Sequence, residues 1–357
     1  MIIHDDVKLD YKDVLLVPKP SNISSRLAVK IASRNIFSPN PTVPIIAANM
    51  DGVGTFKMAK VLAEYQCLTA LNKHYNLNDL LYFYIDNIEF SPYFVYSMGM
   101  NTNDLEKFVK FESTFMRHYF NELNTSKTKQ HLLVPFYKLK VCIDVANGYQ
   151  KEFEDFCLGM RTKFPRHTII AGNVATPEQT ERLFNCGVDV VKIGIGPGSV
   201  CTTRSVTGVG YPQFSAVVEC SRIAKICKKK IIADGGCTEP GDVVKALAAG
   251  ADMVMLGGML AGHDEGEMTS GSDTVKFYGM ASEEAQIVYN NGLADYRSSE
   301  GKSVRVPYRG KVENTIKHIL GGIRSGCSYV GVESVDDLNK SAEFVRVNRT
   351  INNIYGN

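Results

Sequence analysis

The feature that most constrains this chain is an alternation of short apolar segments with helix-like segments. β-Branched and other apolar residues fill several of the short segments almost throughout, as is typical of parallel strands covered on both faces. The expected strands are Val43–Asn49, Cys67–Asn72, Tyr93–Ser97, Leu139–Val145, Thr168–Asn173, Val188–Gly194, Lys230–Asp234 and Ala251–Gly257. The expected helices are Thr55–Tyr65, Asp104–Arg117, Lys151–Phe164, Pro177–Cys186, Gln213–Cys227, Pro240–Ala249 and Val312–Ser325.

Eight strands that alternate with helices predict a (β/α)8 barrel, although periodicity alone also fits a doubly wound open sheet. The position of the polar residues favours the barrel, whose active site is built where the strands end. These residues follow the expected strands at Asn49–Asp51, Asn72–His74, Asp144–Asn147, Asn173, Asp234–Gly236 and Gly257–Gly258. We therefore expect an α/β fold, a single TIM-barrel domain over residues 1–357.

Two segments interrupt the alternation. Residues 118–138 connect a helix to the next strand, on the face opposite the strand ends, and we expect a mobile peripheral loop without a catalytic role. Residues 259–310 follow the eighth strand and are rich in glycine, serine and charged residues. Because a long loop at the active-site end is usually functional, we expect a flap that covers the site.

Composition excludes several other classes of protein. Forty Lys and Arg residues against 38 Asp and Glu give a net charge of +2, which argues against a nucleic-acid partner. No apolar run reaches the roughly 20 residues that a membrane span needs, and the MIIHDDVKLD start does not resemble a secretory signal. The nine cysteines form no CxxC pair, so we expect reduced thiols, no structural zinc and a cytoplasmic protein.

One cysteine stands in an unusual setting. The segment GIGPGSVCTTR (Gly194–Arg204) follows the sixth expected strand, and its glycines and proline allow a tight turn with exposed carbonyl and amide groups. Such carbonyls can hold a cation, and a nearby positive charge increases the thiolate fraction of a cysteine. Cys201 is thus a candidate nucleophile, against the alternative of an incidental cysteine in a flexible loop.

This cysteine loop resembles that of the family of IMP dehydrogenase and GMP reductase. The similarity runs from LDYKDVLLVPKPS at Leu9 to about Val345 and includes Ile231–Leu260 and VPYRG at Val306. NKHY, DVANGY, TGVGYPQ and YRSSEGK resemble the reductase branch, and no room exists for the regulatory domain usually inserted in the dehydrogenases. The resemblance implies a (β/α)8 barrel and NADPH-dependent conversion of GMP to IMP and ammonia.

The resemblance also implies a role for individual residues. Cys201 would form a thioimidate with the purine, while Thr203 and Glu300 relay protons. The nucleotide would be bound by Asp234, Gly235, Gly236, Gly257, Gly258, Gly279, Met280, Ala281, Arg297, Ser298, Ser299 and Gly301. NADPH would lie along Asp144, Val145, Ala146, Ile195, Gly196, Met280, Tyr296 and Arg297.

Two further expectations concern a cation and the assembly. Carbonyl groups of Gly196, Gly198 and Cys201, with Arg204 beside them, resemble the family's potassium (K+) site. A neighbouring subunit of a homotetramer would complete the cofactor site through Ser25, Arg26, Lys73, Ser325, Gly326, Cys327 and Ser328. Two alternatives stay open: an IMP dehydrogenase that lacks the regulatory insertion, and a purine-nucleotide-binding barrel without turnover.

Overall fold

Eight parallel strands close into a barrel in the computed structural model, which describes residues 1–125, 137–266, 273–290, 292, 295–296 and 298–348. The barrel is closed because β11 pairs with β4, which rules out the open sheet and confirms the (β/α)8 fold. Its strands are β4 (Ile45–Ala47), β5 (Leu68–Ala70), β6 (Phe94–Met98), β7 (Lys140–Asp144), β8 (Thr168–Val174), β9 (Val190–Ile193), β10 (Lys230–Asp234) and β11 (Met253–Leu256).

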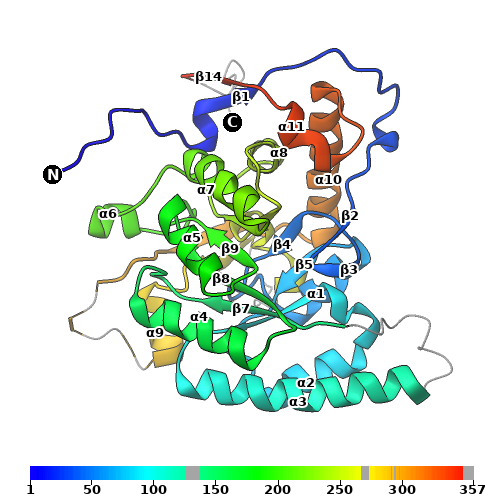
Figure 1. Ribbon diagram of the computed structural model, residues 1–357, viewed down its shortest axis with the longest axis vertical. Coiled ribbons are helices and arrows are strands. Elements are labelled where there is room, and N and C mark those ends of the chain that lie inside the picture. Colours follow the sequence, from blue (N-terminus) through cyan, green and yellow to red (C-terminus); the bar gives the residue numbers. More distant parts are fainter. Residues whose placement is uncertain (126–136, 267–272, 291, 293–294, 297, 349–357) are drawn as a thin grey trace.

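Helices surround the barrel (Figure 1). They are α1 (Phe56–Glu64), α2 (Leu77–Asp86), α3 (Thr102–Thr125), α4 (Lys151–Lys163), α5 (Pro177–Asn185), α6 (Thr203–Thr207), α7 (Gln213–Cys227), α8 (Pro240–Ala248), α10 (Val312–Val330) and α11 (Leu338–Ser341). Short 3-10 turns lie at η1 (Tyr11–Asp13), η2 (Arg26–Ala28), η3 (Ile88–Tyr93) and η7 (Val335–Asp337). Within the described residues, no helix has the length and apolarity of a membrane span.

Two helices differ from the expectation. Helix α2 was not predicted, although Asn76 caps it by accepting a 2.9 Å hydrogen bond from the amide of Asp79. Helix α3 continues to Thr125 instead of ending at Arg117, so the expected loop of residues 118–138 is helical in its first part. The reason is a fully buried aromatic side, in which Phe115 is followed four residues later by Tyr119. Residues 126–136 of that loop lie outside the described residues.

The flap, residues 259–310, contains regular structure. Its described parts include η6 (Asp264–Gly266), the strands β12 (Thr274–Tyr278) and β13 (Ser303–Pro307), and helix α9 (Glu283–Asn290), while η5 (Gly258–Leu260) spans its beginning. The two strands form an antiparallel pair. This pair fixes both ends of the segment that carries α9 and Glu300.

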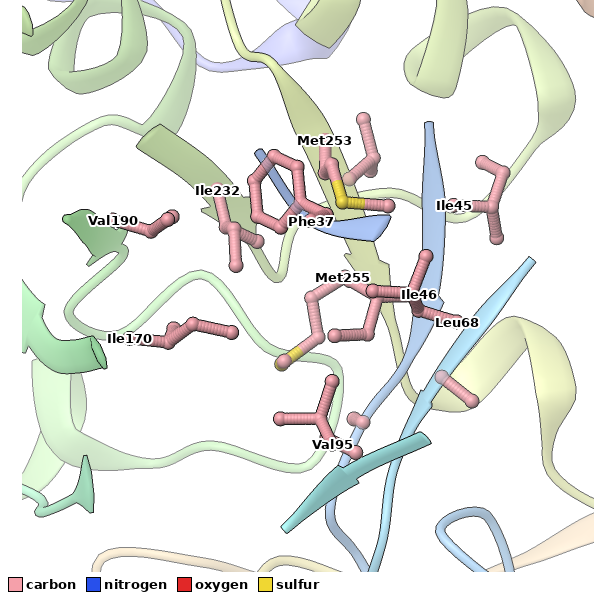
Figure 2. Close-up of a cluster of buried hydrophobic side chains, with 14 of the residues drawn as sticks. Phe37, Ile45, Ile46, Leu68, Val95, Ile170, Val190, Ile232, Met253 and Met255 are labelled. Carbon is pink, nitrogen blue, oxygen red and sulfur yellow. The ribbon is translucent and has the colours of Figure 1, made fainter. Parts of the chain in front are cut away.

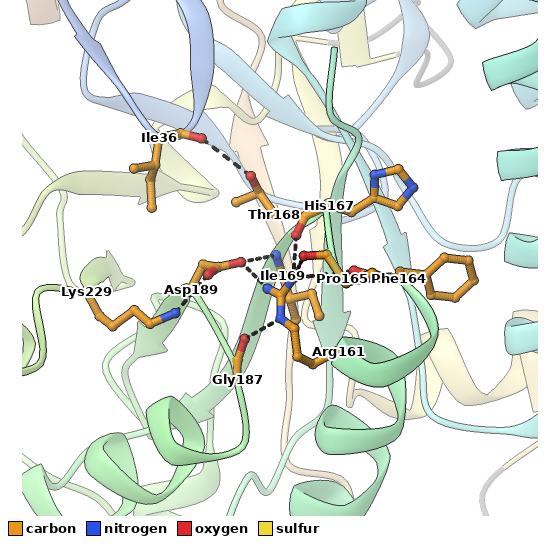
Figure 3. Close-up of polar contacts among 10 residues, drawn as sticks. All are labelled: Ile36, Arg161, Phe164, Pro165, His167, Thr168, Ile169, Gly187, Asp189 and Lys229. Atoms are coloured by element: carbon orange, nitrogen blue, oxygen red, sulfur yellow. Dashed lines mark hydrogen bonds and ion pairs between the residues drawn. The ribbon is translucent and has the colours of Figure 1, made fainter. Parts of the chain in front are cut away.

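A hairpin of β2 (Ser33–Asn35) and β3 (Ser38–Thr42) closes the end of the barrel at which the strands begin. Phe37, at its tip, is 1% exposed and lies near Ile232 and Met253 (Figure 2). The carbonyl of Ile36 accepts a hydrogen bond from Thr168, at the start of β8 (Figure 3). Elsewhere β1 (Val14–Leu16) pairs with β14 (Phe344–Arg346), which joins the two ends of the described chain.

Candidate active site

The loop between β9 and α6 presents Cys201 to a cavity at the carboxyl ends of the strands. The turn depends on Gly196, whose φ of 86° is accessible to glycine at little cost, and the amide of Cys201 donates a 3.0 Å hydrogen bond to the carbonyl of Gly198. Cys201 is half-buried and lines a cavity of about 320 Å³. A thiol in this position is accessible to a ligand.

A hydrogen-bonded series connects the thiol to a carboxylate. Sγ of Cys201 donates to Oγ1 of Thr203 over 3.2 Å, and this hydroxyl donates to Oε2 of Glu300 over 2.8 Å. All three side chains line the cavity. The arrangement can move a proton between the sulfur and the carboxylate through one hydroxyl.

Backbone pairing between the flap and the cysteine loop holds Glu300 in place. The carbonyl of Glu300 accepts a 2.9 Å hydrogen bond from the amide of Thr202, and the amide of Lys302 donates a 2.9 Å bond to Val200. Cys201 and Gly301 form an antiparallel bridge between these bonds. The two catalytic candidates are therefore fixed relative to each other by main-chain hydrogen bonds.

Sequence reasoning missed a buried lysine beneath the cavity. The ammonium of Lys192, on β9, lies 2.5 Å from Oδ1 of Asp144 and 3.2 Å from Oδ2 of Asp234. Burial opposes charge on Asp144, but the attraction of Lys192 prevails and lowers the pKa of Asp144 to about 2. Asn173 donates a 2.9 Å hydrogen bond to Oδ2 of Asp234. The signal was available, because an apolar strand that contains one lysine buries that charge.

The four expected phosphate-binding glycines lie together on the cavity wall. Gly235 and Gly236 have φ values of 90° and 85°, which glycine adopts readily and other residues rarely do. A Cβ added at Gly258 would lie 2.7 Å from Oγ of Ser199, and one at Gly257 would lie 3.0 Å from Sδ of Met50. The absence of side chains here leaves backbone amides accessible to an anion.

A second cavity, of about 400 Å³, adjoins the first, because Lys73 and Met280 line both. One wall comes from the flap, where the ring of Tyr289 stacks on His74 with centroids 3.5 Å apart. The hydroxyl of Tyr289 donates a 2.8 Å hydrogen bond to Asp51. The flap thus forms part of the wall of the second cavity, beside the cavity that Cys201 lines.

Asp51 connects the flap to the barrel. Its Oδ2 accepts a 2.5 Å hydrogen bond from the hydroxyl of Tyr278, and its Oδ1 accepts the bond from Tyr289 and another from Asn72. Sequence reasoning assigned no role to Asp51 or to either tyrosine. The two tyrosines are 11 positions apart in a segment without a recognised motif, so only the fold shows that they meet.

The chain was compared with known proteins. A model described as IMP dehydrogenase / GMP reductase domain matches residues 120–352. GMP reductase 2 of Homo sapiens is 48% identical over 362 residues, which cover 99% of this chain and 98% of the relative. GMP reductase of Phytophthora infestans is 47% identical over 99% of this chain and 94% of its own length. GMP reductase of Aeromonas salmonicida (strain A449) is 46% identical over 100% of this chain and 99% of its own length.

The chain belongs to the IMP dehydrogenase / GMP reductase family. Most residues that the family resemblance implicates line the first cavity, beside Cys201, Thr203 and Glu300. They are Lys73, Asp144, Val145, Ala146, Ile195, Gly196, Gly198, Asp234, Gly235, Gly236, Gly257, Gly258, Gly279, Met280 and Ala281. Lys73 therefore lies at the cavity of its own chain, although the family resemblance had suggested that a neighbouring subunit supplies it.

Other residues implicated by membership of this family lie outside the cavity. Ser298, Ser299 and Gly301 belong to the flap, in which Oγ of Ser299 donates a 2.8 Å hydrogen bond to the carbonyl of Gly301. Tyr296 is exposed, and Arg297 lies outside the described residues. Ser25 caps η2, which packs against α10, the helix that carries Ser325, Gly326, Cys327 and Ser328, and Arg26 begins η2.

The family resemblance assigns a cation to the loop of Gly196, Gly198 and Cys201, in which the carbonyl of Gly198 accepts a hydrogen bond from the amide of Cys201. Arg204 packs against Gly196, and its guanidinium is held by Asp10 at 3.0 Å and by the carbonyl of Tyr211 at 2.6 Å. Within the described part of the chain, no group of three or more His, Cys, Asp or Glu side chains could hold a metal ion.

Proposed function

We propose that this chain catalyses the NADPH-dependent reductive deamination of GMP to IMP and ammonia through a covalent bond to Cys201. The observation that carries the proposal is the hydrogen-bonded series Cys201–Thr203–Glu300 at the wall of a cavity with a glycine-lined phosphate cradle. Full-length relatives named GMP reductase support the choice of reaction.

The first half of the reaction replaces an amine with sulfur. Sγ of Cys201 adds to C2 of the guanine ring as its proton passes to Thr203 and on to Glu300. The exocyclic amine then takes a proton from the same relay and leaves with the electrons of its C–N bond as ammonia. The product of this half is a thioimidate between Cys201 and the purine, and no net proton is gained or lost.

The second half restores the thiol. When bound, NADPH supplies the hydride that C2 needs to become the C–H of IMP. Cys201 departs as a thiolate with the electrons of its C–S bond. Because its first proton left with ammonia, Glu300 and Thr203 are positioned to pass to it a proton taken up from solvent. The adjoining cavity suits the cofactor, with Lys73 and Met280 at the junction and Asp144, Val145 and Ala146 on the wall.

The nucleotide would be fixed at both ends. Asp234, held by Lys192 and Asn173, is oriented to accept hydrogen bonds from the ribose hydroxyls. The amides around Gly235, Gly236, Gly257 and Gly258 would bind the phosphate, in the position where barrels commonly bind it. The base would then lie against Gly279–Ala281, and its C2 would face Cys201.

We further propose that the carbonyls of Gly196, Gly198 and Cys201 hold K+, which would stabilise the turn that presents the thiol. The same proposal extends to a cytoplasmic homotetramer. All nine cysteines are free thiols, and η2 with α10 exposes Leu27 and Tyr329, which are 89% and 64% exposed beside the expected subunit contacts. Light scattering of the purified chain tests the homotetramer. An activity assay in which Na+ replaces K+ tests the cation site.

Two measurements test the reaction. In the first, the nicotinamide absorbance is followed with GMP and NADPH, and separately with IMP and NAD. Oxidation of NADPH by GMP is the expected result, whereas turnover only of IMP and NAD would overturn it in favour of the dehydrogenase.

In the second measurement, the whole-protein mass is determined after incubation with a GMP analogue. An adduct that is lost in C201A supports the covalent step, and full turnover by C201A would exclude it.

A further inference from the structure

A third cavity lies at the opposite end of the barrel from Cys201. It has a volume of about 590 Å³, large enough for a small-molecule ligand. It opens where strands begin, between the β2–β3 hairpin, the end of α7 and the segment around η7 and α11. Its apolar floor includes Phe37, Leu247 and Ala224. The proposed reaction uses none of these residues.

Positive charge dominates the lining of this cavity. Asp252 and Asp336 are its only carboxylates among the described residues, and the cationic lining side chains are Arg34, Lys225, Lys228, Lys229, Lys230 and Lys340. The chain as a whole carries a net charge of only +2, so this concentration is local. A lining of this kind attracts anions.

Several of these cations lack a carboxylate of their own. Within the described residues the side chains of Arg34 and Lys228 make no hydrogen bond or ion pair, and the ammonium of Lys225 donates its hydrogen bond to the neutral amide oxygen of Asn339. Lys229 lies 2.8 Å from Asp189, but that carboxylate is shared with Arg161 (Figure 3). By contrast, Lys230 is paired with Asp252 at 2.7 Å.

The backbone at Lys228 is a second, independent observation. Lys228 ends α7 with a φ of 53°, in the left-handed region where glycine is the usual residue at a helix end. A lysine here accepts backbone strain and gains no partner for its ammonium among the described residues. Strained positions of this kind concentrate at binding sites.

We propose that this cavity binds a small polyphosphate anion, such as the phosphate tail of a nucleoside diphosphate or triphosphate. Arg34, Lys225 and Lys228 would contact the phosphates from the hairpin and the end of α7, with Lys229 adding charge. The apolar floor around Phe37 leaves room for the remainder of the molecule. The site is separate from the proposed GMP cavity and does not depend on that function.

Hydrogen-exchange mass spectrometry of the full chain, titrated separately with pyrophosphate, ATP and orthophosphate, tests the proposal. Pyrophosphate should protect the amides of residues 224–231 and bind more tightly than orthophosphate. Its affinity should fall when salt is added. If ATP binds with the same affinity as pyrophosphate, the site recognises phosphate groups alone. If ATP binds more tightly, the apolar floor also contributes to binding. Both results support the site, whereas protection confined to residues 194–201 and 257–258 would overturn it.

Charge variants provide the second arm. K228G should keep the fold, because glycine adopts the same φ without strain, and should weaken pyrophosphate binding about fivefold. R34Q should have a similar effect. The matched control is K60Q, since Lys60 is exposed on α1 and does not line the cavity. Unchanged binding by both K228G and R34Q, or equal weakening by K60Q, would refute the proposal.

Discussion

The hydroxyl of Thr203 donates a 2.8 Å hydrogen bond to Oε2 of Glu300, a residue 97 positions away in the sequence. The same hydroxyl accepts a bond from Sγ of Cys201 at 3.2 Å. Because a hydroxyl both donates and accepts, Thr203 can pass a proton in either direction. The chemistry proposed for Cys201 needs both directions, once to release ammonia and once to recover the thiol.

Replacing Thr203 with valine tests this relay. T203V preserves the shape of the side chain but removes the hydroxyl, so kcat for GMP reduction should fall about 100-fold with little change in the KM for GMP. T203S is the matched control and should retain most of the activity. Steady-state kinetics measures both variants, and a T203V enzyme with unchanged kcat would exclude the relay.

Lys192 is the buried cation that balances the negative charges of two carboxylates inside the barrel. K192M leaves Asp144 and Asp234 without their buried cation and should lower the free energy of unfolding by about 3 kcal/mol. The control is K317M, because Lys317 pairs with Glu313 on an exposed helix surface, where the loss should stay below about 1 kcal/mol. Urea denaturation distinguishes the two, and equal losses would contradict the assigned role of Lys192.

The same ion cluster gives stability a defined acid dependence. The folded pKa of Asp144, about 2, lies below the roughly 3.9 of an unfolded aspartate. The ionised Asp144 therefore stabilises the folded state fully above a pH of about 4, and this stabilisation disappears as the pH falls toward 2. D144N should remove that part of the acid dependence in urea denaturation between these values. D155N, which changes an exposed aspartate on α4, should leave it unchanged.

The hydrogen bonds that Asp51 accepts should determine how firmly the flap is held against the barrel. Y289F removes the 2.8 Å hydrogen bond to Asp51 while keeping the ring stacked on His74, so amide exchange in residues 283–290 should accelerate about fivefold. The control is Y329F, which changes an exposed tyrosine on α10. Hydrogen-exchange mass spectrometry provides the measurement, and unchanged exchange in Y289F would show that the bond does not hold the flap.

Local patterning predicted all eight barrel strands, because each strand is a compact apolar run that the barrel buries. Helix α2 was missed although Leu80, Phe83 and Tyr84 are buried at helical spacing, because apolar residues such as the exposed Tyr82 also stand at its other positions and obscure this period. The length of α3 was underestimated because polar residues mask the buried aromatic positions, such as Tyr119, near its end. Helical limits of this kind depend on tertiary packing.

The candidate site was predictable where a motif carried it. Cys201 was a candidate from its loop alone, and the family resemblance added the roles of Thr203 and Glu300. The burial of Lys192 could be predicted from its apolar strand. The partners of Lys192 and of Asp51 could not, since they come from distant strands and from the flap. Their roles depend on side chains that only the closed barrel brings within hydrogen-bonding distance.

His74 makes the flap contact sensitive to pH. Burial, followed by the neighbouring charge of Lys73, lowers the pKa of His74 below its ordinary value of 6.5. The folded state thus favours the neutral ring, and its stacking on Tyr289 is fully stable only above pH 6.5. As the pH falls below 6.5, protonation should loosen the flap, and protection factors in residues 283–290 should decline. H74F keeps an aromatic ring that cannot titrate and should abolish this decline, whereas H318F, on the exposed side of α10, should retain it. A decline that persists in H74F would assign the pH dependence to another group.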